Sequence, residues 1–334
     1  MTTVAGARPA VAAQAADHLA ADRVDDQRRL SRAMVSLLIG YVALVVVLMV
    51  ARGAYMSPDL FIVFALVIAV VLGRTRLFLR DWLPFAAIFL AWESMRGMAD
   101  DLGMAVHSDD VIAIERLFFF GRIPSEELQA ALHTAGAVNA LDLAATFLYV
   151  AHFALPLVVA FAFWIVQPAL FYRFLLALMV MSFAAFLCYL LLPVAPPRFA
   201  GAFGEQLAVE DIARSTFMQL HFAPVTTWLY GSVSGNPVAA FPSLHSAYPL
   251  LAYLFARERW PRASLVLLGW SAAIWFAVVY LGHHYVLDVV GGILFAAGAY
   301  LVLKHSSTAS AARWISSMAA RWRSSLHEGD LPAS

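Results

Sequence analysis

Cysteine, lysine and charged residues are all scarce in this chain of 334 residues. Its one cysteine, Cys188, lies in an apolar run, so an internal disulfide is excluded and no cysteine cluster is available for a metal. Charged residues make up 13% of the sequence and their formal sum is zero. Such a balance gives no indication of nucleic acid as a partner.

A secretory signal is also missing from the N-terminal region. The first thirty or so residues are rich in Ala, Arg and Asp, and they contain neither an apolar core segment nor a cleavage-site pattern. We therefore interpret residues 1–32 as a mobile cytoplasmic tail. Residues 305–334 are interpreted as a cytoplasmic tail.

Apolar residues are what the sequence has in excess. They make up 62% of the chain, far above the share in a soluble domain. Their long runs predict an all-α integral membrane protein with about eight transmembrane helices. The expected spans are residues 33–50, 60–73, 82–95, 141–166, 174–192, 243–255, 263–281 and 285–303.

The basic residues predict the orientation of these spans. With the N-terminus inside, sixteen of the 22 Lys and Arg residues fall in inner segments and six in outer ones, as expected for cytoplasmic loops. Both termini should then be cytoplasmic. Two outer segments, residues 96–140 and 193–241, are long and rich in apolar residues, so we expect them to pack on the membrane surface.

Two clusters in the outer segments favour phosphate binding. The string Pro-Val-Ala-Pro-Pro-Arg ends a span and leaves Arg198 at the interface. The string Phe-Pro-Ser-Leu-His-Ser opens the sixth span, with Pro242 near its first position and with Ser243 and His245 beside free backbone amides that can bind an anion. Alternatively, Arg198 is a membrane anchor and the second string a capped helix with an interfacial histidine.

A third cluster favours nucleophilic chemistry. His284 and Asp288 are four residues apart at the start of the last span, hence one helical turn apart on one face. The carboxylate can accept a hydrogen bond from one ring nitrogen and leave the other free to attack. A purely structural pair is the alternative, although an acid just inside the bilayer is costly and usually functional.

The inferred topology places Arg198, His245 and His284 on the same outer face. In this combination the sequence resembles the type-2 phosphatidic acid phosphatase superfamily, whose motifs are a basic one ending in Arg-Pro, a Pro-Ser-x-His and a His-x-x-x-Asp. The resemblance implies a six-helix core preceded here by two additional helices. It divides the chain into two accessory transmembrane helices at residues 33–80 and a catalytic membrane domain at residues 81–304.

The same resemblance assigns roles to the motif residues. It implies that His284 attacks phosphorus, that Asp288 orients His284, and that His245 protonates the leaving oxygen and then activates water or an alcohol. Arg198 and Ser243 would hold the phosphate oxygens. Neither a metal nor a cofactor is expected.

Two departures bear on the substrate. The lysine and arginine usual in the superfamily's first and third motifs are replaced by Leu191 and Val278. The strings Phe-Pro-Ser-Leu-His-Ser and His-His-Tyr are similar to those of the inositol phosphorylceramide synthase (aureobasidin-resistance) branch, which includes transferases. We therefore expect a lipid phosphatase or phosphotransferase in a bacterial plasma membrane, acting outside the cytoplasm on a lipid phosphate or phospholipid, with water or a polyol as acceptor. A prenyl phosphate phosphatase and a transporter are the alternatives.

Five further residues are candidates for substrate binding, each with a structural alternative. Glu93, Arg96 and Asp100 lie at the outer end of the third span, where they could equally form an ion-paired helix end. His152 is polar at membrane depth but could be a satisfied core histidine, and His283 could be a mere neighbour in its turn. Residues 109–127 are expected to form an interfacial helix that guides a lipid chain or only packs.

Overall fold

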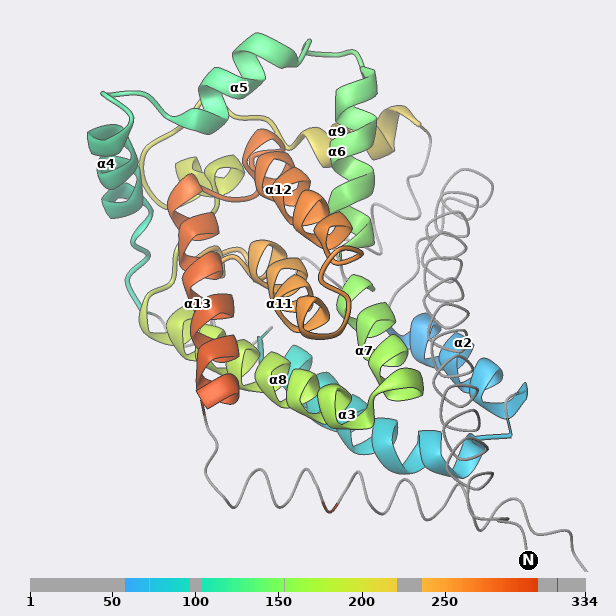
Figure 1. Ribbon diagram of the computed structural model, residues 1–334. Coiled ribbons are helices and arrows are strands. Elements are labelled where there is room, and N and C mark those ends of the chain that lie inside the picture. The colour runs from blue at the N-terminus through green and yellow to red at the C-terminus, as the bar shows by residue number, and fades with distance from the viewer. Residues whose placement is uncertain are drawn as a thin grey trace, which may run out of the picture. The chain divides into compact units, whose positions relative to one another are not determined.

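The structure, a computed structural model, describes residues 58–71, 73–96, 104–152, 154–220, 236–305 and 317. All of them belong to one compact unit, residues 48–334. Within these ranges the regular structure is helical, and two isolated β-bridges form without any strand (Figure 1). This confirms the all-α prediction for the described residues. The first expected span, residues 33–50, lies outside them, as do residues 1–32 and most of the C-terminal tail.

Seven expected spans coincide with helices of the structure. These are α2 (Pro58–Val71), α3 (Thr75–Arg96), the pair α6 (Ala140–Ala151) and α7 (Leu155–Val166), α8 (Pro168–Leu191), α11 (Leu244–Arg259), α12 (Leu265–Tyr280) and α13 (Val286–His305). Among the described residues, α8 and α13 are each long and apolar enough to cross a membrane, and α6 with α7 makes a third candidate if the pair forms one span. The count of eight transmembrane helices stays a prediction.

The fourth expected span is a bent pair of helices. α6 and α7 meet at an angle of 49°, and Pro156 occupies the first turn of α7. Proline has no N–H to donate into the preceding turn, so a helix can begin there but cannot run straight through. The bend places His152, at the end of α6, where its ring can reach neighbouring helices.

α11 is the central helix of the described bundle. It packs against α13, α12, α8 and α7, and Figure 1 shows it between α12 and α8. Its start lies close to α13, because the hydroxyl of Ser246 donates to the carbonyl of Val289 at 3.1 Å. A Cβ atom on Gly292 would meet the carbonyl oxygen of Ser243 at 2.1 Å. Only glycine permits this approach of the start of α11 to the second turn of α13.

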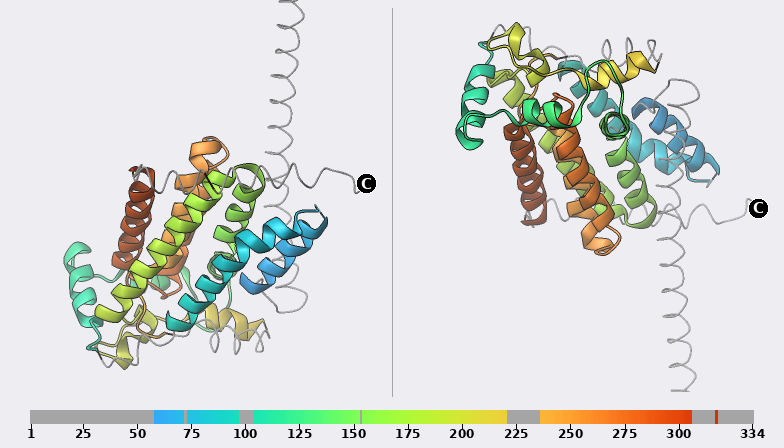
Figure 2. Two further views of the ribbon diagram at one scale, coloured as in Figure 1. Left: turned by 90° about the horizontal axis from the view of Figure 1, so that it is seen from below. Right: turned by 90° about the horizontal axis from the view of Figure 1, so that it is seen from above.

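Shorter elements gather at the end of the bundle where α11 and α13 begin. They are α4 (Ser108–Phe118), α5 (Pro124–Leu132), the 3-10 helix η2 (Pro197–Ala202) and α9 (Ile212–Gln219), and Figure 2 shows them at one end of the long helices. The single interfacial helix expected at residues 109–127 is wrong, since α4 and α5 are separate. Gly121, with φ of 85°, turns the chain between them.

Basic residues mark the opposite end of the bundle. Arg173, at the start of α8, donates to Glu258 near the end of α11 at 3.0 Å. The guanidinium of Arg257 lies 5.4 Å from the centre of the Tyr300 ring, near the end of α13. Arg173 and Arg257, which the sequence assigns to the cytoplasmic side, therefore share one end of the described bundle.

Candidate active site

The two histidines singled out by the sequence lie in contact. Nε2 of His284 is 3.0 Å from Nδ1 of His245, a distance at which one nitrogen donates to the other. On its other side, Nδ1 of His284 lies 3.4 Å from Oδ2 of Asp288. His284 and Asp288 are buried, with exposed fractions of 5% and 0%. His284 is thus held between a carboxylate and a second imidazole.

The turn after α12 places His284 at this point. Gly282 adopts φ of 76°, and a Cβ atom there would lie 2.5 Å from Cγ1 of Val209. The next two residues, His283 and His284, both direct their backbone N–H groups to the carbonyl of Val278, at 3.0 and 3.1 Å.

Asp288 also accepts from the backbone N–H of Tyr285 at 2.8 Å, so one carboxylate fixes the start of α13 and faces His284.

Ser243 forms the N-cap of α11. Its hydroxyl oxygen accepts from the backbone N–H of Ser246 at 3.3 Å, and its own N–H donates to the carbonyl of Asp288 at 3.0 Å. The helix begins at Leu244, so Pro242 precedes the cap and does not lie in the first turn. The capped-helix alternative therefore describes Ser243 correctly, and a role in phosphate binding would use the hydroxyl hydrogen.

Arg198 lies beside Asp211, a residue that the sequence analysis did not single out. Nε of Arg198 is 3.3 Å from Oδ2 of Asp211, and Nε2 of His283 is 3.2 Å from Oδ1 of the same carboxylate. Arg198 also donates its backbone N–H to the carbonyl of Gly282 at 3.1 Å. Asp211 therefore joins the arginine motif to the turn that carries the histidines.

The charges of this group follow from burial and contact. Burial lowers the pKa of His283 to about 4, with Arg198 acting in the same direction and Asp211 against both. Burial alone would raise the pKa of Asp211, but His283 and Arg198 outweigh it, so the pKa lies well below its usual range. At neutral pH the group is an ion pair of Arg198 and Asp211, with a neutral His283 donating to the carboxylate.

Aromatic rings from α6 cover His245. The ring of His152 lies 4.0 Å from that of His245 between centroids, and the ring of Tyr149 stacks on His245 at 4.9 Å. Tyr149 also lies 4.2 Å from the ring of His283. The structure thus brings His152 and His283 to the site. The side chains of Glu93 and Arg96 on α3, and Asp100 altogether, lie outside what the structure describes.

Comparison with known proteins agrees with this constellation. Residues 110–302 match the model of the PAP2 superfamily, which is more than half of the chain and includes Arg198, His245 and His284. The chain belongs to the PAP2 superfamily. The resemblance inferred from the three motifs is therefore confirmed.

Three curated relatives of this PAP2 protein carry synthase names. A phosphoinositol dihydroceramide synthase of Bacteroides thetaiotaomicron is 30% identical over 128 residues, covering 36% of this chain and 41% of the relative. Inositol phosphorylceramide synthases of Schizosaccharomyces pombe and Candida albicans are each 27% identical. The region matched by the Schizosaccharomyces pombe protein covers 44% of this chain and 36% of that protein. The region matched by the Candida albicans protein covers 46% of this chain and 34% of that protein. The chain thus spans about two fifths or less of each relative. No solved structure matches it.

The two departures from the PAP2 pattern have different surroundings. Leu191 ends α8 with an exposed fraction of 70%, whereas Val278 is fully buried in α12. A guanidinium at the position of Val278 would have to be buried among apolar side chains of the core cluster around Ile274, Ala277 and Tyr280. The packing of α12 in this PAP2 protein is therefore built for an apolar residue there.

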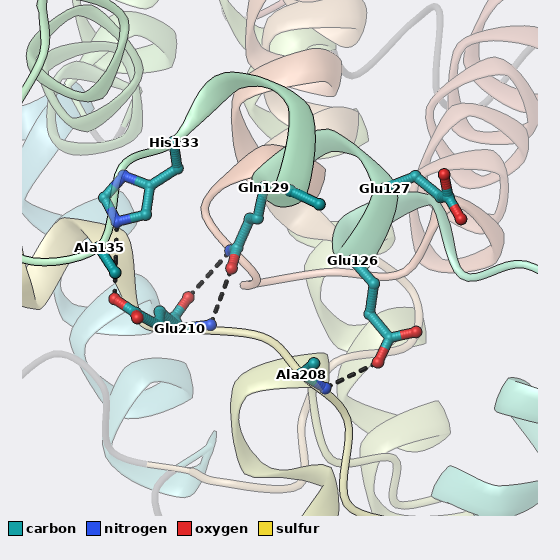
Figure 3. Close-up of a pocket in the computed structure, with 8 residues that line it drawn as sticks. Glu126, Glu127, Gln129, His133, Ala135, Ala208 and Glu210 are labelled. Atoms are coloured by element: carbon teal, nitrogen blue, oxygen red, sulfur yellow. Dashed lines mark hydrogen bonds and ion pairs between the residues drawn. The ribbon is translucent and has the colours of Figure 1, made fainter.

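A pocket of about 420 Å³ lies between α5 and the segment that precedes α9 in the PAP2 protein. Figure 3 shows its lining, with Glu126 and Glu127 from α5, His133 after that helix, and Glu210 from the facing segment. Gln129 ties the pocket to the end of α12, since its amide nitrogen donates to the carbonyls of Tyr280 at 2.8 Å and Glu210 at 3.0 Å. Three glutamates make the pocket unsuited to a phosphate group.

Proposed function

We propose that this PAP2 protein is a membrane lipid phosphatase or phosphotransferase that works through a phosphohistidine on His284. The observation that carries the proposal is the placement of His284 between Asp288 and His245. A carboxylate that accepts a hydrogen bond from the Nδ1–H group keeps the proton on Nδ1 and leaves the Nε2 lone pair available for attack. Nε2 is the nitrogen that faces His245, the candidate acid.

The first step transfers the phosphoryl group to His284. Nε2 of His284 forms a bond to phosphorus while the bond between phosphorus and the leaving oxygen breaks. His245, protonated on Nδ1, gives its proton to that oxygen. In the resting site this proton bridges the two rings at 3.0 Å, so an entering substrate has to replace the contact between the histidines. Asp288 stabilises the positive charge that develops on the His284 ring.

The second step regenerates the enzyme. His245, now neutral, takes a proton from water or an alcohol, whose oxygen attacks phosphorus and breaks the bond to His284. Arg198 and the hydroxyl of Ser243 would stabilise the non-bridging oxygens in both steps. Because a histidine, an acid and a guanidinium supply these functions, we propose that the reaction needs no metal ion.

The acceptor separates the two candidate functions. Water as acceptor makes a phosphatase of lipid or prenyl phosphates, and a polyol makes a transferase. The names of the three relatives favour a phosphoinositol transferase. Arg198 is the one basic residue of the superfamily motifs that this sequence retains. A site with one basic residue agrees with a transferase, since a phosphodiester donor has less charge than a phosphate monoester. We therefore propose two functions for this site, a phosphatase and a polyol phosphotransferase.

A substrate panel tests the proposed function. Purified protein incubated with phosphatidic acid, an isoprenyl phosphate or phosphatidylinositol should turn over at least one donor, with EDTA present and with inhibition by vanadate. If the enzyme is a transferase, titration with myo-inositol should lower phosphate release from a lipid phosphate and yield inositol phosphate, because the lipid alcohol has already left in the first step. Mass spectrometry of the lipid and water-soluble products, together with a phosphate assay, measures how the phosphoryl group is divided between the two acceptors. Fast phosphate release that no acceptor diverts would leave only the phosphatase.

Thiol labelling tests the proposed sidedness of the site. Thr134, exposed in the segment between α5 and α6, lies at the site's end of the bundle, and Ala263, exposed between α11 and α12, lies at the basic end. In a Cys188→Ala background, Thr134→Cys should react with a membrane-impermeant maleimide in intact cells. Ala263→Cys should react only after the membrane is opened. The reverse pattern would place the site in the cytoplasm.

A further inference from the structure

Glu115 is a buried acid that the proposed reaction does not use. It lies on the inner face of α4 beside Val111 and Ile112, with an exposed fraction of 1%. This face covers the start of α13, where Oε1 of Glu115 accepts from the backbone N–H of Leu287 at 3.2 Å. Its other oxygen, Oε2, is buried without a hydrogen-bond partner in the described structure. Burying a carboxyl group costs free energy unless its oxygens are hydrogen-bonded, so a specific task for Glu115 is indicated.

The task visible in the structure is capping of α13 from outside the helix. The first N–H groups of a helix have no partner within it. Asp288 accepts a hydrogen bond from the N–H of Tyr285. Glu115 accepts one from the N–H of Leu287, which is 172 residues further along the chain. Both carboxyl groups thus hold one helical turn, and this turn fixes the position of Asp288 relative to His284.

We infer that Glu115 is a positioning residue, which anchors the first turn of α13 to α4 and so holds Asp288 in register with His284. The inference rests on the proposed function, because it assigns Glu115 to the phosphotransfer site. Glu115 acts through the helix start and touches neither histidine in the described contacts. Loss of the anchor would let the outer elements and the catalytic turn move independently.

The surroundings of Glu115 favour its neutral form at moderate pH. Burial raises its pKa to about 7; the N–H of Leu287 opposes this and the charge of Asp288 adds to it. Tyr285 and Asp288 are the titratable groups at the start of α13, and neither is a cation. Arg116, next in sequence, is paired with Glu205 at the surface. Ionisation of Glu115 would therefore place a second negative charge near Asp288.

Three variants test the positioning role. Glu115→Ala should lower kcat by about tenfold to a hundredfold with a smaller change in KM, the range expected for misplaced catalytic groups. Glu115→Gln retains a neutral acceptor for Leu287 and should recover most of that loss. Asp110→Ala, on the same helix with its side chain 72% exposed, is the matched control and should behave like the unchanged protein. The pH profile of kcat gives a further test. In the unchanged protein kcat should fall as the pH rises through about 7, and in Glu115→Gln this fall should be absent.

Thermal unfolding gives a readout that does not need a substrate. Because the folded pKa of Glu115 lies above its unfolded value of 4.5, its stabilisation is complete below pH 4.5 and is lost as the pH rises to about 7. Tm of the unchanged protein should therefore fall between pH 4.5 and about 7, and Tm of Glu115→Gln should lack this fall. A thiol-reactive dye on the one cysteine, Cys188, can follow unfolding in detergent.

The outcomes separate failure of this inference from failure of the proposed function. If Glu115→Ala matches the unchanged protein in kcat while His284→Ala is inactive, the positioning role is wrong and the phosphohistidine proposal stands. If His284→Ala is active, the proposed function fails whatever Glu115 does. A Glu115→Gln variant as impaired as Glu115→Ala, or one with an unchanged pH dependence of Tm, would also contradict the inference.

Discussion

Replacement of His284 by alanine is expected to abolish turnover, with a loss on the order of 10⁵-fold or more, as for removal of a covalent nucleophile. The methyl group cannot form the bond to phosphorus, and no other nitrogen occupies the position between His245 and Asp288 in the described site. Phosphate release or phosphoryl transfer from the most active donor of the panel measures the loss.

A second histidine serves as the control for that variant. His107 precedes α4, pairs with Asp110 at 2.7 Å and has a side chain 36% exposed, so His107→Ala should retain full activity. Tm of both variants should be recorded, because an unfolded His284→Ala protein would be inactive for a trivial reason. A folded His284→Ala protein with full activity would eliminate the phosphohistidine mechanism.

Replacement of Asp288 by asparagine should lower kcat by about 10⁴-fold, the size of effect that follows when a histidine loses its orienting carboxylate. The amide keeps the shape of the side chain and can still accept from the N–H of Tyr285. It cannot stabilise the charged His284 ring or enforce the tautomer with Nδ1 protonated. The measurement is kcat with saturating donor.

Asp110→Asn on α4 is the control, since it neutralises an exposed acid outside the site. A loss in Asp288→Asn of less than about tenfold would show that His284 does not depend on the carboxylate. The pair would then be structural, as the sequence alone also allowed.

The site was accessible to sequence reasoning where its residues are close in the chain or share a membrane face. The spacing of His284 and Asp288 fixes them on one side of a helix start, and the structure places them there. The distribution of basic residues predicts that Arg198 lies at the same end of the bundle as both histidines. The structure places it there, since its backbone N–H donates to the carbonyl of Gly282 in the turn that carries His284. Neither inference required knowledge of packing.

Contacts between distant segments could not be predicted in the same way. Asp211 reaches His283 over 72 residues and Glu115 reaches Leu287 over 172, and no periodicity connects such pairs. A weak signal for Asp211 existed, because an aspartate is a favoured N-cap residue and Asp211 caps the short helix α9. Glu115 interrupts the apolar face of α4, which is unusual for an acid but has no spacing rule to interpret it.

Helix ends show a similar limit. The expected span at residues 174–192 begins six residues too late, because Pro168 starts α8 and polar or aromatic residues continue its first turns. The expected span at residues 141–166 is divided near His152, where apolarity alone predicts a continuous helix. Hydrophobic runs locate the buried middle of a helix, whereas prolines and caps decide where it starts and stops.

Trapping the covalent intermediate tests the central proposal most directly. The protein is mixed with a donor labelled in its phosphoryl group, quenched with alkali within one turnover, digested, and analysed for acid-labile phosphate by mass spectrometry. The phosphoryl group should be attached to the peptide that carries His284, and the label should be absent from Asp288→Asn and His284→Ala. Rapid turnover with no labelled His284, or label on a different residue, would contradict the phosphohistidine mechanism.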